Sequence, residues 1–203
     1  PLCDSVADAE RLVAAADAAG VAVAEEKPDA RLQQARTAFD EAHTLWDAGH
    51  YADAVAKGEQ AVALHEAVLG GTHPDVARSL DQLGLHHLLQ GNPVRAEPLF
   101  SRALAIRKAA FGEHNRFVAT ALLDLGTLYV AQGLYARAEP LLLRALAIRE
   151  ASLGKDHLEV ARTLQDLAWF YDLQGLLARA EPLLLRTLAI REASLDKDHP
   201  LVA

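Results

Sequence analysis

Histidines are the first residues of this chain whose type and spacing could support chemistry, because imidazole is a common metal ligand. The sequence contains nine of them. His73, His157 and His199 recur at one position of a repeated pattern, and Asn115 stands there in the remaining copy. Ligands that recur once per repeat lie one repeat apart in space and cannot converge on one ion. An asparagine at the same place instead favours a hydrogen bond to the start of the following helix.

The other candidates for chemistry lack the partners that a reaction needs. His86 and His87 are adjacent on a predicted helix, so they point about 100° apart and cannot chelate one metal. Carboxylates could serve as a general acid and base, but the sequence has no nucleophile elbow, no phosphate-binding glycine loop and no H-E-x-x-H motif. We therefore expect no catalytic residues, no cofactor, no metal and no enzymatic activity in this stretch of chain. A full-length protein could still carry a kinase or another catalytic domain.

Composition and charge exclude further classes of function. Alanine and leucine dominate and β-branched runs are missing, which favours helices and predicts an all-α fold. The net charge of −8 and the pI near 5.5 argue against a nucleic-acid partner. No apolar run approaches the ~18–20 residues that span a bilayer, so no membrane insertion is expected. The sequence leaves the compartment open, with the cytoplasm favoured.

The strongest signal in the chain is self-similarity at a period of 42 residues. Glycines, and two sets of alanines, recur at this spacing. The stretches over residues 136–157 and 178–199 differ only at Ala145/Thr187 and Gly154/Asp196. The recurring positions are Gly49, Gly91, Gly133 and Gly175; Ala54, Ala96, Ala138 and Ala180; and Ala63, Ala105, Ala147 and Ala189.

Each repeat is predicted to form two helices, called A and B. In the third repeat, helix A is expected from about Arg116 to Gln132, and Gly133 ends it in a left-handed conformation. Helix B is expected from about Tyr135 to Leu153. Pro140 is expected within its first turn or so, where a missing N–H group costs nothing.

Small residues are expected to let the two helices of a repeat approach closely. Gly84, Gly126 and Ala168 on the A helices precede Ala96, Ala138 and Ala180 on the B helices by twelve residues. One helix pair cannot bury both of its apolar sides, so stacked neighbours must complete the core.

These motifs resemble the 42-residue tetratricopeptide repeats of kinesin light chains and their bacterial relatives. The resemblance rests on A-x-x-L-x-x-L-G/A-x-x-Y, G-x-x-x-x-A-E-P-L, A-L-A-I-R and K-D-H-P, and covers roughly Leu32 to Ala203. It implies a right-handed superhelical α-solenoid of stacked antiparallel helix pairs. The expected organisation is an N-terminal helical segment (1–30), an atypical capping repeat (31–72), three regular repeats (73–114, 115–156, 157–198) and the start of a truncated fifth repeat (199–203).

The N-terminal segment carries a second resemblance. Its opening Pro-Leu-Cys followed by an alanine-rich stretch is similar to the region before the repeats in myxobacterial-type serine/threonine kinases. That resemblance implies a sensor or regulatory tail of a larger signalling enzyme. In a membrane kinase, such a tail would lie in the periplasm or outside the cell.

The family resemblance further implies that the A helices line a concave face that binds extended peptides. Paired asparagines in kinesin light chains correspond here to Asp81-Gln82, Leu123-Asp124 and Gln165-Asp166, and the carboxylate clamp of chaperone-binding relatives is absent. We therefore expect a protein or peptide partner of basic or mixed character, with apolar anchors against Trp169 or Phe39. The alternative is a solvated face of a spacer. The predicted groove residues are Arg36, Phe39, Asp40, His43, Arg78, Asp81, Gln82, Leu85, Thr120, Leu123, Asp124, Thr127, Arg162, Gln165, Asp166 and Trp169.

Self-assembly is a further alternative function. If the array stops where a fifth helix A begins, the last helix B exposes Leu183, Leu184 and Leu188 or neighbouring apolar groups. An uncapped end of this kind could stack on a second copy and form a homo-oligomer.

Overall fold

The structure, a computed structural model, describes residues 30–194 of the chain. These residues form eight α-helices and no strand, as the composition predicts. The N-terminal segment expected over residues 1–30 lies outside the described residues apart from Ala30, and so does the start of a fifth repeat over residues 199–203. The helices are α2 (Ala30–Asp47), α3 (Tyr51–Leu69), α4 (Pro74–Leu89), α5 (Pro93–Phe111), α6 (Arg116–Ala131), α7 (Tyr135–Leu153), α8 (Leu158–Asp172) and α9 (Leu177–Ser194).

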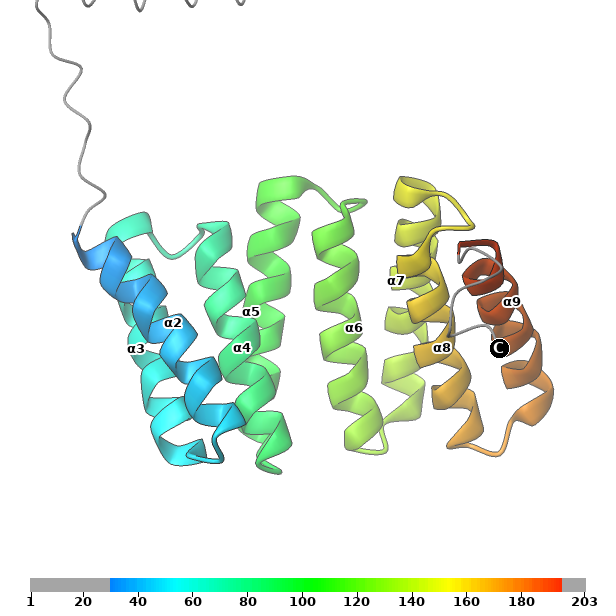
Figure 1. Cartoon of the computed structure of the whole chain (residues 1–203), viewed down its shortest axis with the longest axis horizontal. Coiled ribbons are helices and arrows are strands. Elements are labelled where there is room, and N and C mark those ends of the chain that lie inside the picture. The colour runs from blue at the N-terminus through cyan, green and yellow to red at the C-terminus, as the bar shows by residue number, and fades with distance from the viewer. Residues whose placement is uncertain (1–29, 195–203) are drawn as a thin grey trace, which may run out of the picture.

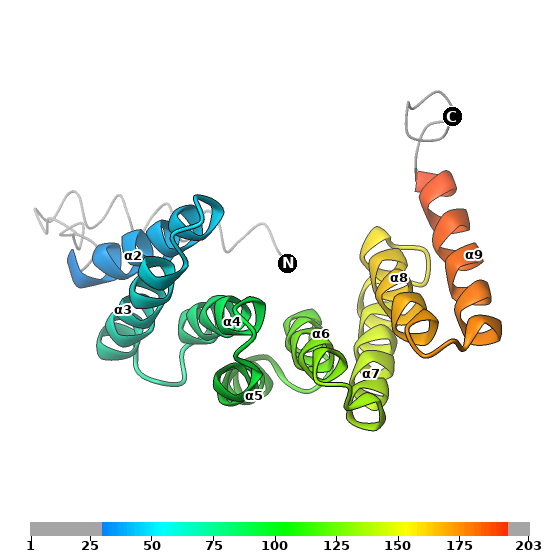
Figure 2. The ribbon, with the colours of Figure 1, turned by 90° about the horizontal axis from the view of Figure 1, so that it is seen from below.

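The helices stack side by side in one superhelical row (Figure 1). Each even-numbered helix packs most extensively against the helix that follows it, so the row consists of four hairpins. Seen from below, the row is curved, with α2, α4, α6 and α8 on its inner side and α3, α5 and α7 on its outer side (Figure 2). The fold class expected from the sequence is therefore confirmed.

The recurring histidine and asparagine begin the A helices. His73 Nδ1 accepts a hydrogen bond of 3.1 Å from the backbone N–H of Asp75, and His157 Nδ1 does the same for Glu159. Asn115 Oδ1 accepts the corresponding bond at 2.9 Å. Each bond satisfies one of the free N–H groups at a helix start. The predicted capping role is confirmed for these three residues, and His199 lies outside the described residues.

The glycines that end the A helices adopt the predicted left-handed conformation. Gly133 has a φ of 72°. Its N–H donates to Val130 O at 2.9 Å, and the N–H of Leu134 donates to Tyr129 O at 2.8 Å. This pair of bonds is the Schellman arrangement, which satisfies the last carbonyls of α6.

Pro140 lies deeper in its helix than the sequence suggested. Helix α7 begins at Tyr135, so Pro140 falls in the second turn rather than the first, and it removes the donor for the carbonyl of Ala136. Both residues are exposed, so water can solvate this carbonyl.

The glycines of the A helices make room for a large side chain of helix B. The sequence had suggested that they mainly face the small alanines Ala96 and Ala138. A Cβ atom on Gly84 would lie 2.9 Å from the ring of Phe100, and one on Gly126 would lie 2.7 Å from Leu142 Cδ2. Phe100 and Leu142 are buried as a result. The close approach therefore accommodates a knob of helix B rather than two facing small residues.

A polar tie joins consecutive repeats. Tyr129 Oη donates to Glu97 Oε1 at 2.8 Å, while Arg137 Nη2 donates to the same carboxylate at 3.1 Å and to Tyr129 Oη at 2.6 Å. The guanidinium also lies 4.0 Å from the centroid of the tyrosine ring. We call this set the Glu–Tyr–Arg tie. It recurs one repeat later in Glu139, Tyr171 and Arg179.

The first junction, between α3 and α4, is built differently. Val55 and His87 occupy the places of the tie's glutamate and tyrosine, so no tie forms there. Trp46 instead stacks on the buried His86, with ring centroids 4.4 Å apart and an interplanar angle of 2°. Burial lowers the pKa of both His86 and His87, so each is neutral in the folded state near pH 7.

Replacing His157 tests the capping role. We expect His157→Ala to lower the free energy of unfolding by about 0.5–2 kcal/mol, because the N–H of Glu159 loses its acceptor. His157→Asn should leave stability nearly unchanged, since Asn115 makes the same bond in the preceding repeat. Urea unfolding followed by circular dichroism measures the difference. His50→Ala is the matched control, because His50 precedes α3 without making a side-chain cap bond.

Candidate functional site

The predicted groove residues all lie on α2, α4, α6 and α8, the helices on the inner side of the curved row (Figure 2). The structure brings about half of them together. A cavity of about 510 Å³ lies on this face, over α2, α4 and α6. We call it the central cavity. It is lined by Phe39, Asp40, His43 and Thr44 of α2, by Arg78, Asp81, Gln82 and Leu85 of α4, by Phe100 of α5 and by Asp124 of α6.

Two half-buried carboxyl groups form the acidic side of the central cavity. Burial raises the pKa of Asp81 to about 7, although the ion pair with Arg107 opposes this shift. Burial likewise raises the pKa of Asp124 to about 6. Within the described residues, Asp124 has no cation at ion-pair distance. The charges of Arg107, Arg149 and Arg162 lower the pKa of Asp124 in part, but burial outweighs them. The lining of the cavity holds three carboxyl groups, of Asp40, Asp81 and Asp124, and one arginine, Arg78.

The groove also contains basic side chains that were not predicted from the sequence. His65, Arg107, Arg149 and Arg191 occupy one position of helix B at the 42-residue spacing. Arg107 pairs with Asp81, and Arg191 donates to Gln165 Oε1 at 2.5 Å in the same geometry two repeats later. The sequence signal for the three arginines was their recurrence at the 42-residue spacing, at the end of the repeated L-A-I-R motif of helix B.

Arg149 departs from this pattern because Leu123, at the matching place on α6, offers no acceptor. The buried guanidinium instead donates to Thr163 Oγ1 at 2.7 Å and pairs with Glu159 at 3.3 Å. It also reaches Thr120 Oγ1 at 3.5 Å. Arg149 therefore bridges α6 and α8 across the face of the groove.

The first two repeats meet through the residues next to the central cavity. The guanidinium of Arg78 lies 4.4 Å from the ring centroid of Phe39, and Gln82 Nε2 donates to the carbonyl of Phe39 at 3.2 Å. A smaller cavity of about 290 Å³ adjoins these residues and also includes Arg36, Asp40, His65 and Asp75 in its lining. Its mixed charge contrasts with the acidic central cavity.

The third repeat contributes less than predicted. Leu123 is buried in the core, so it does not present a surface to the groove. Thr120 donates to Arg116 O at 3.3 Å and contacts Arg149, and Thr127 is exposed outside the cavity lining. Only Asp124 of this repeat lines the central cavity.

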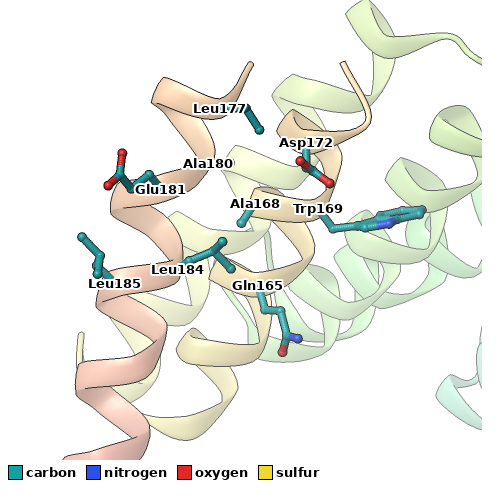
Figure 3. A pocket seen from close by; sticks show the side chains of 9 residues that line it. All are labelled: Gln165, Ala168, Trp169, Asp172, Leu177, Ala180, Glu181, Leu184 and Leu185. Carbon is teal, nitrogen blue, oxygen red and sulfur yellow. The ribbon is translucent and has the colours of Figure 1, made fainter. Parts of the chain in front are cut away.

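The predicted residues of the fourth repeat lie apart from the central cavity. Gln165 and Trp169 line a separate cavity of about 600 Å³ between α8 and α9. Figure 3 shows the Trp169 ring projecting away from the leucines of α9. Arg162 and Asp166 are exposed, and the partial desolvation of Asp166 by its neighbours raises its pKa. These four residues therefore form a second region rather than an extension of the central cavity.

Metal and membrane sites were the other possibilities for residues 30–194. No group of three or more His, Cys, Asp or Glu side chains there could hold a metal ion. No helix in the same range is long and apolar enough to cross a membrane.

Comparison with protein families agrees with the repeat geometry. The tetratricopeptide repeat family matches residues 33–109 and 117–193. The chain belongs to this family. No curated protein sequence matches the chain.

Solved structures with the same fold support this assignment. BtubC (BKLC) from P. vanneervenii is 25% identical over 87% of this chain and 70% of that protein, with a TM-score of 0.74. A Podosopora anserina protein with nearly identical TPR-like repeats is 24% identical over 86% of this chain and 82% of its own, with a TM-score of 0.72. Aspartyl phosphate phosphatase F from Bacillus subtilis shares the fold at 15% identity, with a TM-score of 0.69; the match covers 81% of this chain and 42% of that protein.

The resemblance to kinesin-light-chain-like repeats is therefore confirmed. The tetratricopeptide repeat is a protein–protein interaction fold whose members are generally non-catalytic, and stacked repeats provide the extended surface for binding.

The raised pKa of Asp124 predicts a dependence of stability on pH. A carboxyl whose folded pKa is about 6, above its usual 3.8, binds a proton more tightly in the folded state, so its contribution to stability falls as pH rises from 4 to 7. We expect Asp124→Asn to be more stable than the parent by about 1–3 kcal/mol at pH 7.5 and nearly equal to it at pH 4. Denaturant unfolding at both pH values measures this.

The difference between variant and parent isolates Asp124, because the buried histidines, which act in the opposite direction, are common to both proteins. Asp156→Asn, at an exposed loop carboxylate, is the control. An equal effect of Asp124→Asn at both pH values would contradict the assignment.

Proposed function

We propose that the chain binds a peptide or an extended segment of a partner protein on its concave face, with a basic side chain in the central cavity. The observation that carries this proposal is the convergence of carboxylates from three helices on one cavity, namely Asp40 of α2, Asp81 of α4 and Asp124 of α6. Residues far apart in the sequence thus present the same charge to one space.

The cations already present do not balance these carboxylates. Arg107 is engaged by Asp81, and Arg78 is held on the ring of Phe39. Among the described residues, Asp81 Oδ1 and Gln82 Oε1 are buried acceptors without a donor. A lysine or arginine of a ligand would supply donors to these oxygens and offset the cost of keeping two half-buried carboxylates ionised.

Apolar groups beside the acids supply the second part of the proposed specificity. Phe39 and Leu85 line the same cavity, and Leu85 is exposed. A large apolar side chain next to the basic one would bury this surface and contribute affinity that salt does not screen. Exposed Trp169, in the fourth repeat, is the proposed second anchor.

The division of the chain into repeats is also part of this proposal. We take the four hairpins as the four repeats expected from the sequence, with α2 and α3 as the atypical first one. As the regulatory tail of a signalling enzyme, the chain would act through this same concave face.

A comparison of two peptides of equal length tests the proposal. One alternates lysine or arginine with leucine and tryptophan, and the other has glutamate at every basic position. We expect the basic peptide to bind at least about tenfold more tightly in fluorescence anisotropy, with an affinity that falls as salt rises. Asp81→Asn with Asp124→Asn should weaken it about tenfold, whereas Asp156→Asn should not. Equal binding of both peptides, or no effect of the double variant, would support the spacer alternative.

A further inference from the structure

The cavity of about 290 Å³ beside the central cavity is lined by residues of α2, α3 and α4, which lie at one end of the array (Figure 2). We call it the small cavity. Its volume is at the lower end of the range of about 300–1,000 Å³ that is typical of ligand pockets, so it would take a small molecule. Phe39 is the one apolar side chain in its lining, which otherwise consists of Arg36, Asp40, His65, Asp75 and Arg78.

The four charged groups of the small cavity do not neutralise one another. Neither Arg36 nor Asp40 forms an ion pair with any of the described residues. Arg78 lies over the ring of Phe39, an arrangement that leaves N–H groups of the guanidinium able to donate. Two positive and two negative side chains therefore surround one cavity.

Asp75 also lacks a cation. Its carboxylate approaches Nδ1 of His73 at 3.7 Å, but that nitrogen accepts the backbone N–H of Asp75. A ring nitrogen that accepts a hydrogen bond carries no proton, so it does not pair with the carboxylate.

His65 of α3 adds a buried polar atom to the lining. Its side chain is 4% exposed, and its Nδ1 lies 2.9 Å from Ser79 Oγ. The other ring nitrogen, Nε2, has no hydrogen-bond partner among the described residues. Burial lowers the pKa of His65, so the ring is neutral near pH 7 and adds no further charge. Nε2 is therefore left to donate to, or accept from, a bound molecule.

The third repeat shows what the first repeat lacks. Positions two repeats apart correspond as follows: Arg149 to His65, Thr163 to Ser79, and Glu159 to Asp75. Arg149 donates to Thr163 Oγ1 at 2.7 Å and pairs with Glu159 at 3.3 Å. The shorter His65 keeps the contact with Ser79 but brings no cation to Asp75. A positive group of a ligand would take the place beside Asp75 that an arginine of the chain takes in the third repeat.

A ligand with a single charge fits this lining poorly. An anion would meet Arg36 and Arg78 but also two carboxylates, and a cation would meet the reverse. A molecule with both a carboxylate and an ammonium group can pair with both kinds of side chain. Arg36 and Arg78 stand at the same position of consecutive A helices and line the same cavity, so two guanidinium groups can bind one carboxylate.

We propose that the small cavity binds a free α-amino acid. The carboxylate of the amino acid binds Arg36 and Arg78, its ammonium group binds Asp75, and one of the two groups bonds to Nε2 of His65. This site is additional to the peptide site proposed for the central cavity and does not depend on it.

Calorimetric titration of the full chain with each of the common L-amino acids tests the proposal. We expect at least one of them to bind saturably. Two derivatives of that amino acid each lack one charge, because the N-acetyl derivative has no ammonium group and the amide has no carboxylate. Each derivative should bind at least about tenfold more weakly than the free amino acid.

Three variants assign the two charges to residues. Arg36→Gln should weaken binding of the free amino acid about threefold to tenfold and reduce its advantage over the amide, because both changes remove the same ion pair. Asp75→Asn should likewise reduce the advantage over the N-acetyl derivative. His65→Arg should abolish binding, because the new guanidinium would pair with Asp75 as in the third repeat. Asp156→Asn, at an exposed loop carboxylate, is the control and should bind as the parent does.

Circular dichroism should show each variant folded, since Arg36 is exposed, Asp75 is half-buried and the later repeats carry arginine at the position of His65. The proposal is wrong if none of the amino acids binds saturably. It is also wrong if the N-acetyl derivative or the amide binds as tightly as the free amino acid, which would leave a site for a cation or an anion alone. Binding that neither Arg36→Gln nor Asp75→Asn changes would place the amino acid elsewhere on the chain.

Discussion

Every part of this molecule depends on the burial of one A helix in the groove that the preceding hairpin leaves open. A hairpin of this kind has apolar residues on two sides and can cover only one of them itself, so its neighbour completes the core. The knobs Phe100 and Leu142 fit against glycines within a hairpin and are then covered by the next A helix. The curvature that places four A helices on one inner face follows from repeating this contact, and so does the position of the central cavity.

The repeat and its ends could be predicted from the sequence because they depend on local rules. A period of 42 residues, a capping side chain and a glycine stop define helices almost residue by residue, as the agreement for Tyr135–Leu153 illustrates. Contacts between hairpins could not be predicted in this way. Whether Leu123 turns into the core, and whether Arg149 bridges α6 and α8, depends on the angle between neighbouring hairpins, which no single repeat encodes.

The sequence allowed residues of the candidate site to be predicted, but not the cavity that they form. The family resemblance implied that Asp81 and Asp124 lie on one concave face, and the curvature of the array brings them to one space with Asp40. Their raised pKa values could not be read from the sequence, because they arise from desolvation by residues of several helices. Half-buried carboxylates that are kept ionised reduce the stability of the chain, and local conflicts of this kind are expected at functional sites.

The contacts between neighbouring hairpins are of two kinds. One kind is sensitive to salt, and the other is sensitive to pH. The two later junctions hold a Glu–Tyr–Arg tie, whose ionic part weakens as salt screens it. The first junction depends on Trp46 stacked on a buried, neutral His86 beside His87, so it weakens when pH falls below about 6.5 and the unfolded state takes up protons more readily. Helix α2 forms one wall of the central cavity and sits on this joint. Acid would therefore loosen that wall while leaving the later repeats stacked.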